Sequence, residues 1–256
     1  MTRLSHVLIV MIAATVHGGY AQDRGGGRGS EPVTARTAAP FDLTGHWVSI
    51  VTEDWRWRMF PNRGDYAGVP LNAEGRKLAG SWDPVRDEAA GEQCKAFGAP
   101  GLMRIPGRFH ITWQDDQTLK VESDAGGQIR LFYFGAAPAA RAADWQGVSK
   151  AEWEFTRQGL GFAIAGDRGG ARGGSLKVTT AHLRPGYLRR NGVPYSANAR
   201  LTEYYDLVKG AGGATYLILT SIVEDPTYLL QPMITAAHFR KQIDATGWNP
   251  KPCALR

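Results

Sequence analysis

Long hydrophobic runs are nearly absent from this sequence, which excludes a protein with several membrane-spanning helices, each needing roughly 20 apolar residues. The one early run, VLIVMIAATV at positions 7–16, is too short for a comfortable span. It follows Arg3 and precedes the small residues GYA at 19–21, the pattern of a secretory signal peptide. We expect residues 1–21 to be removed, with an uncleaved anchor as the alternative. The mature chain should be periplasmic or secreted, with no membrane insertion.

The motifs of several large enzyme classes are also missing. The sequence has no GxxxxGK[ST], no GxGxxG after an expected strand, no HExxH and no GxSxG. Their absence argues against P-loop NTPases, dinucleotide-binding folds, zinc proteases and α/β-hydrolases. The glycine-rich stretch at 166–175 lacks the Lys-Ser/Thr ending of a phosphate-binding loop, so we predict a flexible connection and no cofactor.

Cysteine is limited to Cys94 and Cys253, with no CxxC pair and no histidine near either one. This spacing argues against a metal site, and we predict none. In an exported protein an even pair indicates a disulfide instead. Such a bond would join the C-terminus to the body and stabilise the fold by about 2–4 kcal/mol.

The net charge of +6 is weak evidence for a polyanionic partner. Part of the excess lies near the N-terminus (Arg24, Arg28, Arg36) and part in the glycine-rich stretch 159–174. Together with export, this distribution leads us to expect no nucleic-acid partner. Residues 22–40 lack apolar periodicity and predict a disordered leader. Residues 41–256 then form a single domain, of unknown oligomeric state.

Short β-type segments separated by turn residues dominate that domain. The stretch 108–123 predicts two strands around a polar turn, and further strands are expected at 128–134, 149–155, 174–184, 199–208, 215–225 and 233–242, the last with a short helix as the alternative. GHWVSIVTEDWRWRM, at 45–59, predicts one long bent strand. Helical composition is confined to 72–82 and 83–97. The pattern indicates an all-β antiparallel barrel or sandwich of roughly 8–10 strands.

FDLTGHW, at 41–47, contains Gly45-His46-Trp47, which resembles the Gly-x-Trp signature of lipocalins and the wider calycin barrels. The resemblance implies a lipocalin-like barrel in which Trp47 closes one end and an arginine of the last strand, here Arg240, packs over it. Residues 60–107 would then be an insertion after the first strand, containing the short helices. Over its whole length the chain is also similar to exported bacterial proteins of unknown function, in DWRWRM, AGEQC and RPGYLRRNGVPYSANA. That similarity implies no activity.

A barrel interior is either filled by side chains or holds one small ligand. The chain has 8 Trp, 9 Tyr and 9 Phe residues, which can line an apolar pocket or simply fill the core. In EDWRWRM, alternation separates Trp55 and Trp57 on one face from Asp54, Arg56 and Arg58 on the other. We predict that this polar face lies at a barrel mouth, where an arginine can bind a ligand carboxylate. A surface ladder of charges is the alternative.

The stretch 201–207 has Glu203 and Tyr205 on an otherwise apolar face, and 176–182 has His182 on another. Burial among apolar neighbours would raise the pKa of Glu203 and suit it to proton transfer, with His182 as its partner. The alternative is a structural histidine and an edge glutamate. His110 faces a pocket mouth or solvent, depending on which face of its strand is core.

These residues lead to two hypotheses. The first is an exported barrel protein that binds a partly apolar small molecule, anionic or aromatic, through Asp54, Arg56, Arg58, Trp55, Trp57, His110 and Tyr205. The second is a lyase, isomerase or hydrolase on the same scaffold, with Glu203 and His182 as its acid–base pair. A structural protein whose rings fill its own interior is a third possibility. Fold alone does not choose among them.

Overall fold

The structure, a computed structural model, describes residues 33–52, 55–58, 61–138, 142–155 and 173–254. The predicted signal peptide, the leader up to residue 32, Asp54 and most of the glycine-rich stretch lie outside these ranges. Within the described part, residues 33 onward form one compact unit. None of the described helices is long and apolar enough to span a bilayer.

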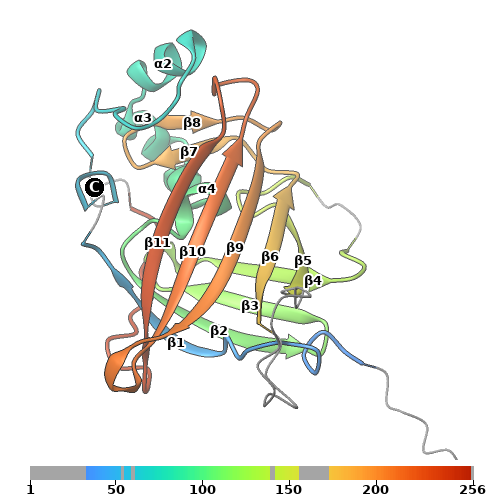
Figure 1. The fold of residues 1–256 in the computed structure, drawn as a ribbon. Helices are drawn as coiled ribbons and strands as arrows, with labels where there is room; N and C mark the ends of the chain where they lie inside the picture. Colours follow the sequence, from blue (N-terminus) through green and yellow to red (C-terminus); the bar gives the residue numbers. More distant parts are fainter. Residues whose placement is uncertain (1–32, 53–54, 59–60, 139–141, 156–172, 255–256) are drawn as a thin grey trace, which may run out of the picture. The chain divides into compact units, whose positions relative to one another are not determined.

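Nine described strands close into a barrel (Figure 1). They are β1 (Gly45–Ile50), β2 (Arg108–Asp115), β3 (Thr118–Ser123), β4 (Ile129–Phe134), β5 (Val148–Phe155), β6 (Gly174–Ala181), β9 (Arg200–Lys209), β10 (Thr215–Glu224) and β11 (Met233–Gln242). Their order around the barrel is β1-β11-β10-β9-β6-β5-β4-β3-β2. The pairs are antiparallel except β4 with β5, which is parallel. The prediction of an all-β barrel is confirmed.

The insertion between β1 and β2 contains most of the helical turns, as the sequence predicted. These are α1 (Trp55–Arg58), α2 (Ala73–Gly80), α3 (Pro84–Ala89), the 3-10 helix η1 (Gln93–Phe97) and α4 (Ala99–Leu102). A separate hairpin of β7 (Gly186–Arg189) and β8 (Val193–Tyr195) contacts α2, α4 and η1. We call residues 72–102 and 184–195 together the cap. Figure 1 shows α2, α3 and the hairpin at one end of β9, β10 and β11. Two further 3-10 turns, η2 (Ala125–Gly127) and η3 (Ala211–Gly213), lie in loops.

The cap packs into the barrel core. Phe97 and Leu102 share one apolar cluster with the inward side chains of the barrel, among them Phe109, Phe132 and Phe239. A second cluster joins the hairpin to the adjoining ends of the barrel strands: Leu188, Val193, Tyr195, Leu201, Val223 and Met233. Large apolar side chains that are removed from water in this way are the main stabilising contribution to such a fold. The cap is therefore part of the folded body rather than an appended loop.

The Gly-x-Trp segment is as expected except for the residue that packs over Trp47, which is Lys241 and not Arg240. Gly45 has a φ of 111°, which glycine adopts without strain, and Trp47 is fully buried with its indole N–H donated to the carbonyl of Leu43 at 2.9 Å. The cation over the Trp47 ring is the ammonium of Lys241, 5.4 Å from the ring centroid. Arg240 is exposed because neighbouring residues of a strand point to opposite faces.

The prediction of one long strand over 45–59 is wrong. β1 ends at Ile50, and Trp55–Arg58 form a helical turn instead. Arg58 points inward, 4% exposed, and donates hydrogen bonds to the carbonyls of Ile50 (2.7 Å) and Arg104 (3.0 Å). These bonds need the backbone to fold back on itself, which an extended strand cannot do. Trp55–Arg58 therefore do not form the two alternating faces that the sequence predicted.

The predicted disulfide between Cys94 and Cys253 is present, with Cα atoms 5.2 Å apart. It joins η1 of the cap to the C-terminal segment. The backbone N–H of Lys251 also donates to the carbonyl of Asp124 at 2.9 Å. At the other end of the described chain, the indole N–H of Trp153 donates to the carbonyl of Ala35 at 2.8 Å, so residues just before 41 contact the barrel.

Candidate functional site

A cleft of about 430 Å³ lies in the cap, between the helices and the hairpin. We call it the cap cleft. Its aromatic lining consists of Trp82, Tyr187, Tyr195 and Tyr228, and its charged lining of Arg86, Asp87, Glu92 and Lys95. Volumes of this order hold small molecules, and a mostly apolar lining with a few polar groups is typical of ligand pockets.

Local sequence signals fix the helices that form the cleft. Asn72 caps α2, accepting a hydrogen bond from the N–H of Gly75 at 2.8 Å, and its amide donates to the carbonyl of Thr227 at 2.9 Å. Asp83 caps α3, and Pro84 occupies the first turn, where no backbone donor is needed. These capping residues determine where α2 and α3 begin, and Trp82 lies between the end of α2 and the start of α3.

The Asn191-Gly192 turn of the hairpin positions Trp82 from the opposite side. Gly192 has a φ of 83°, and a Cβ atom there would lie 2.2 Å from the Trp82 ring. Only glycine fits both the left-handed backbone and this close approach. The ring of Trp82 then meets that of Tyr187 edge to face, with centroids 6.4 Å apart.

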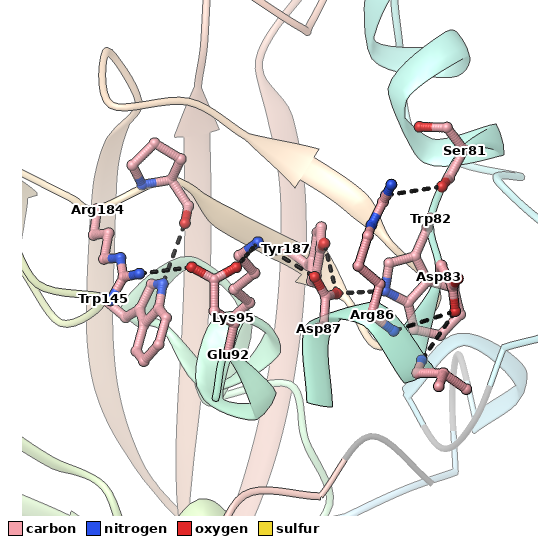
Figure 2. Close-up of polar contacts among 12 residues, drawn as sticks. Ser81, Trp82, Asp83, Arg86, Asp87, Glu92, Lys95, Trp145, Arg184 and Tyr187 are labelled. Atoms are coloured by element: carbon pink, nitrogen blue, oxygen red, sulfur yellow. Dashed lines mark hydrogen bonds and ion pairs between the residues drawn. The ribbon is translucent and has the colours of Figure 1, made fainter. Parts of the chain in front are cut away.

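Asp87 is the centre of the polar network in the cleft (Figure 2). Its carboxylate is nearly buried and accepts hydrogen bonds from the Tyr187 hydroxyl (2.7 Å), the Trp82 indole (3.1 Å) and the Lys95 ammonium (3.3 Å). Burial and the bond to Asp87 raise the pKa of the Tyr187 hydroxyl, which therefore stays protonated at neutral pH. The network holds both rings of the cleft wall in fixed orientations.

A second carboxylate, Glu92, completes the network (Figure 2). It pairs with Lys95 and with the guanidinium of Arg184, the latter at 2.7 Å. The hydrogen bond from Lys95 and the charges of Lys95 and Arg184 lower the pKa of Glu92, although partial burial acts in the other direction. Arg184 also lies over the ring of Trp145, 4.4 Å from its centroid. Glu92, like Asp87, therefore already has cationic partners.

Arg86 differs from the other charged groups of the cleft. Its side chain is exposed and makes one long hydrogen bond, 3.4 Å, to the carbonyl of Ser81. Within the described residues no carboxylate pairs with it. A guanidinium in this condition is suited to a ligand carboxylate, which it binds through two parallel hydrogen bonds.

The described part of EDWRWRM, Trp55–Arg58, does not line the cap cleft, and Asp54 lies outside the described residues. Arg56 pairs with Asp65 at 2.8 Å, and the Trp57 indole is directed at the same carboxylate at 3.4 Å. Desolvation acts to raise the pKa of Asp65, but the hydrogen bonds from Ala67, Trp57 and Arg56 and the charge of Arg56 together outweigh it and lower the pKa. Trp55 is largely exposed, and Arg58 is bonded to backbone carbonyls. The structure thus places Arg56 and Trp57 at Asp65, and none of Trp55–Arg58 at the cap cleft.

Glu203 is inward-facing and fully buried, as the alternation predicts, but its partner is Arg130. The guanidinium donates to both carboxylate oxygens, at 2.9 and 2.6 Å, and the Tyr205 hydroxyl donates to the carboxylate at 3.2 Å. Burial raises the pKa of Tyr205 well above its usual range. Arg130 escaped the sequence analysis, although IRLFYF has an arginine on the same face as two buried phenylalanines, Phe132 and Phe134.

His182 and Glu203 are not brought together. His182 has a φ of 56°, and this left-handed turn ends the alternation of β6. The side chain is exposed and lines a hollow on the outer face of the barrel, beside Ile129 and Tyr133. An acid–base pair of these two groups requires contact, which this arrangement lacks.

His110 lies on the outer face as well. Its ring stacks on that of His46 at 4.1 Å, and its Nδ1 atom is 3.3 Å from the Glu122 carboxylate. Burial and the neighbouring His110 lower the pKa of His46, against a smaller opposing effect of Asp244. Among the described residues, no three His, Cys, Asp or Glu side chains are grouped closely enough to hold a metal ion.

The cap cleft itself was missed at the sequence level. Its residues occur in 78–95 and 185–195, with Tyr228 from the connection between β10 and β11, and only tertiary packing brings these segments together. The available signal was the Asp83-Pro84 helix start directly after a tryptophan, and the Asn191-Gly192 turn. No protein-family model matches the chain, and no curated protein and no solved structure matches it either.

Proposed function

We propose that this barrel protein binds a small, partly apolar aromatic acid in its cap cleft. The observation that carries the proposal is the cleft of about 430 Å³ in which four aromatic side chains meet a network of fixed charges. Barrel proteins that resemble lipocalins offer a rigid frame for such a site, and here the site lies on the cap because the cap packs into the barrel core.

The aromatic character of the ligand follows from the walls of the cleft. Trp82 and Tyr187 are held edge to face, and both donate hydrogen bonds to Asp87, so the cleft wall presents two fixed aromatic side chains. Flat ligands gain from offset-stacked or edge-to-face contacts with such rings. An immobilised wall also loses little conformational entropy on binding.

The acidic character follows from the charge balance. Asp87 and Glu92 are already paired with Lys95 and Arg184, whereas Arg86 has only a carbonyl partner among the described residues. Arg86 can therefore bind a ligand carboxylate without breaking an existing ion pair.

The disulfide supports export of the protein, since such bonds persist in oxidising compartments. Recovery of the chain from the cytoplasm with its first residues intact would contradict export.

Titration calorimetry with 4-ethylbenzoate and with its neutral counterpart, 4-ethylbenzyl alcohol, tests the proposal. Replacing Arg86→Gln should weaken binding of the acid about tenfold, since a charge-assisted hydrogen bond is worth roughly 1.5 kcal/mol, and should leave the alcohol unaffected. The matched control is Arg63→Gln: Arg63 is also exposed, also bonds one backbone carbonyl, that of Gly80 at 3.2 Å, and does not line the cleft. Absence of binding by either compound to the unmodified protein would refute the proposal.

A further inference from the structure

Two hollows on the outer face of the barrel meet at His182, apart from the cap cleft. One has a volume of about 360 Å³ and the other of about 480 Å³, and they share Pro138, Val148 and His182 as lining residues. Among the described residues, none that lines the cap cleft also lines either hollow. We call the two hollows together the outer groove.

The first hollow has an apolar wall. Ile129, Leu131 and Tyr133 alternate along β4, so their side chains share the outward face of that strand and line the hollow together. Ile129 is 52% exposed. The carboxylate of Asp144 also lines this hollow, but it accepts hydrogen bonds from two backbone N–H groups, at 2.8 and 2.6 Å. Contiguous apolar surface beside an open space is suited to the apolar part of a ligand.

The second hollow has a cationic lining. Lys150 of β5 and Arg200, the first residue of β9, are exposed and line it together with Thr179 of β6. Within the described part of the chain, no carboxylate lines this hollow and no ion pair involves Lys150 or Arg200. This holds even for Glu224, which is opposite Arg200 in the β9–β10 register. The second hollow therefore offers two positive charges and a hydroxyl to an anion.

His182 lies where the two hollows meet. Its φ of 56° is positive, and no other described residue except glycine has a positive φ. Such strained backbone conformations cluster at ligand-binding and switch sites. The exposed imidazole lines both hollows and makes no hydrogen bond or ion pair within the described residues. A ring N–H is therefore available to an anionic group between the apolar and the cationic side.

Strand pairing places the apolar and the cationic side next to each other. Tyr133 is opposite Lys150 in the parallel β4–β5 pair, and Lys150 is opposite Thr179 in the β5–β6 pair. One outward-facing row therefore runs from an aromatic ring to an ammonium group and on to a hydroxyl. A ligand that spans this row has to combine an apolar body with a negatively charged end.

We propose that the outer groove is a second binding site, which takes a single-chain anionic amphiphile such as an alkyl carboxylate or an alkyl phosphate. The anionic head contacts Lys150, Arg200 and His182, and the hydrocarbon chain covers the wall that contains Ile129 and Tyr133. This ligand class differs from the aromatic acid of the cap cleft, and the two sites share no lining residue among those described.

Titration calorimetry with octanoate, octyl phosphate and the neutral 1-octanol tests the role of charge. At least one of the two anions should bind with one molecule per chain and more tightly than the alcohol, and the tighter anion identifies the head group. The double variant Lys150→Gln/Arg200→Gln should weaken its binding at least about tenfold, because charge-assisted hydrogen bonds are lost, and should leave the alcohol unaffected. The matched control is Lys209→Gln/Arg240→Gln, since both residues are exposed on barrel strands and neither lines the groove.

Two single variants locate the ligand. Ile129→Ser should weaken binding of the anion severalfold, whereas Ile234→Ser, at a position 66% exposed on β11, should not change it. Arg86→Gln should leave the anion unaffected. The proposal is overturned if neither anion binds, if the alcohol binds as tightly as the anions, or if Arg86→Gln weakens the anion as much as the double variant does, because that result places it in the cap cleft. Binding of 4-ethylbenzoate is measured separately, so failure of this proposal leaves the proposed function intact.

Discussion

Glu203 lies where a carboxylate is hardest to accommodate, at 0% exposure inside the barrel. The bidentate bond with Arg130 compensates the loss of hydration, and Thr180 accepts a further hydrogen bond from the same guanidinium at 3.3 Å. Such a pair contributes little net stability when intact, but removal of one member leaves an uncompensated buried charge. The two side chains neutralise each other's charge, which favours a structural role over proton transfer.

The Glu203→Gln variant should therefore be strongly destabilised, by about 3–5 kcal/mol, because the Arg130 guanidinium keeps its charge without a counter-ion. Urea unfolding measures the loss. Glu154→Gln is the control: it breaks a pair with Lys177 at 2.9 Å on the exposed surface and should cost less than about 1 kcal/mol. Equal losses in the two variants would show that the buried pair has no special importance.

Individual residues were predictable where strand periodicity alone decides their environment. Alternation correctly assigned Glu203 and Tyr205 to the interior. It did not supply Arg130, because the contact joins β4 to β9 across the barrel and depends on how nine strands close. It also failed for His182, where a single left-handed residue turns the side chain outward. A two-residue alternation does not say which distant strands lie together, nor where a single residue leaves the extended conformation.

At the scale of elements, the strand over 45–59 illustrates the limits of pattern. The alternating charges and tryptophans of 54–58 are equally compatible with one turn of helix, and the hydrogen bonds of Arg58 to the carbonyls of Ile50 and Arg104 decide for the turn. Arg104 is distant in sequence, so tertiary contacts override the local pattern. The helices of 72–89 were predictable because their capping residues are local signals.

The η1 element should loosen in acid. Its first turn is held by Glu92, whose folded-state pKa is lowered below 4.5 by Lys95 and Arg184. A lowered pKa means that this stabilisation is fully present above about pH 4.5 and is lost as pH falls through the folded-state value. The protection factor of the Lys95 amide, which donates to the Glu92 carbonyl at 3.0 Å, should decrease over that range once the exchange rate is corrected for the intrinsic effect of pH. In Glu92→Gln this decrease should disappear, and an unchanged pH profile of the protection factor in that variant would assign it to another group.

At the scale of the whole molecule, the fold class was predictable and the position of the hollow was not. Short alternating segments with turn residues between them predict an antiparallel barrel or sandwich, and the resemblance of Gly45-His46-Trp47 favoured the barrel that the structure shows. Whether the barrel encloses space depends on what packs into its end. Here Phe97 and Leu102 of the insertion join the inward-facing rings of the barrel strands, and the cleft forms on the cap instead. A resemblance based on the first strand has no information about that insertion.

The disulfide couples the cap cleft to the end of the chain. Cys94 lies in η1 directly before Lys95, and Cys253 belongs to the C-terminal segment, 159 residues later in sequence. Because a bond across so long a separation restricts the unfolded chain, its loss should lower the free energy of unfolding by about 2–5 kcal/mol. Reduction should also release η1, and with it the ammonium that holds Asp87 and Glu92, so affinity for 4-ethylbenzoate should fall together with stability.

Calorimetry and urea unfolding before and after reduction measure both effects, and the double variant Cys94→Ser/Cys253→Ser should reproduce them and be insensitive to reductant. A loss of stability with unchanged affinity would mean that the hairpin and α3 hold the cleft without η1. A loss of affinity in proportion to stability would mean that the barrel, the cap and the C-terminal segment act as one unit. The second outcome is expected, because Asp87 accepts hydrogen bonds from both η1, through Lys95, and the hairpin, through Tyr187. Loss of either hydrogen bond to Asp87 would therefore loosen the cleft wall that the ligand contacts.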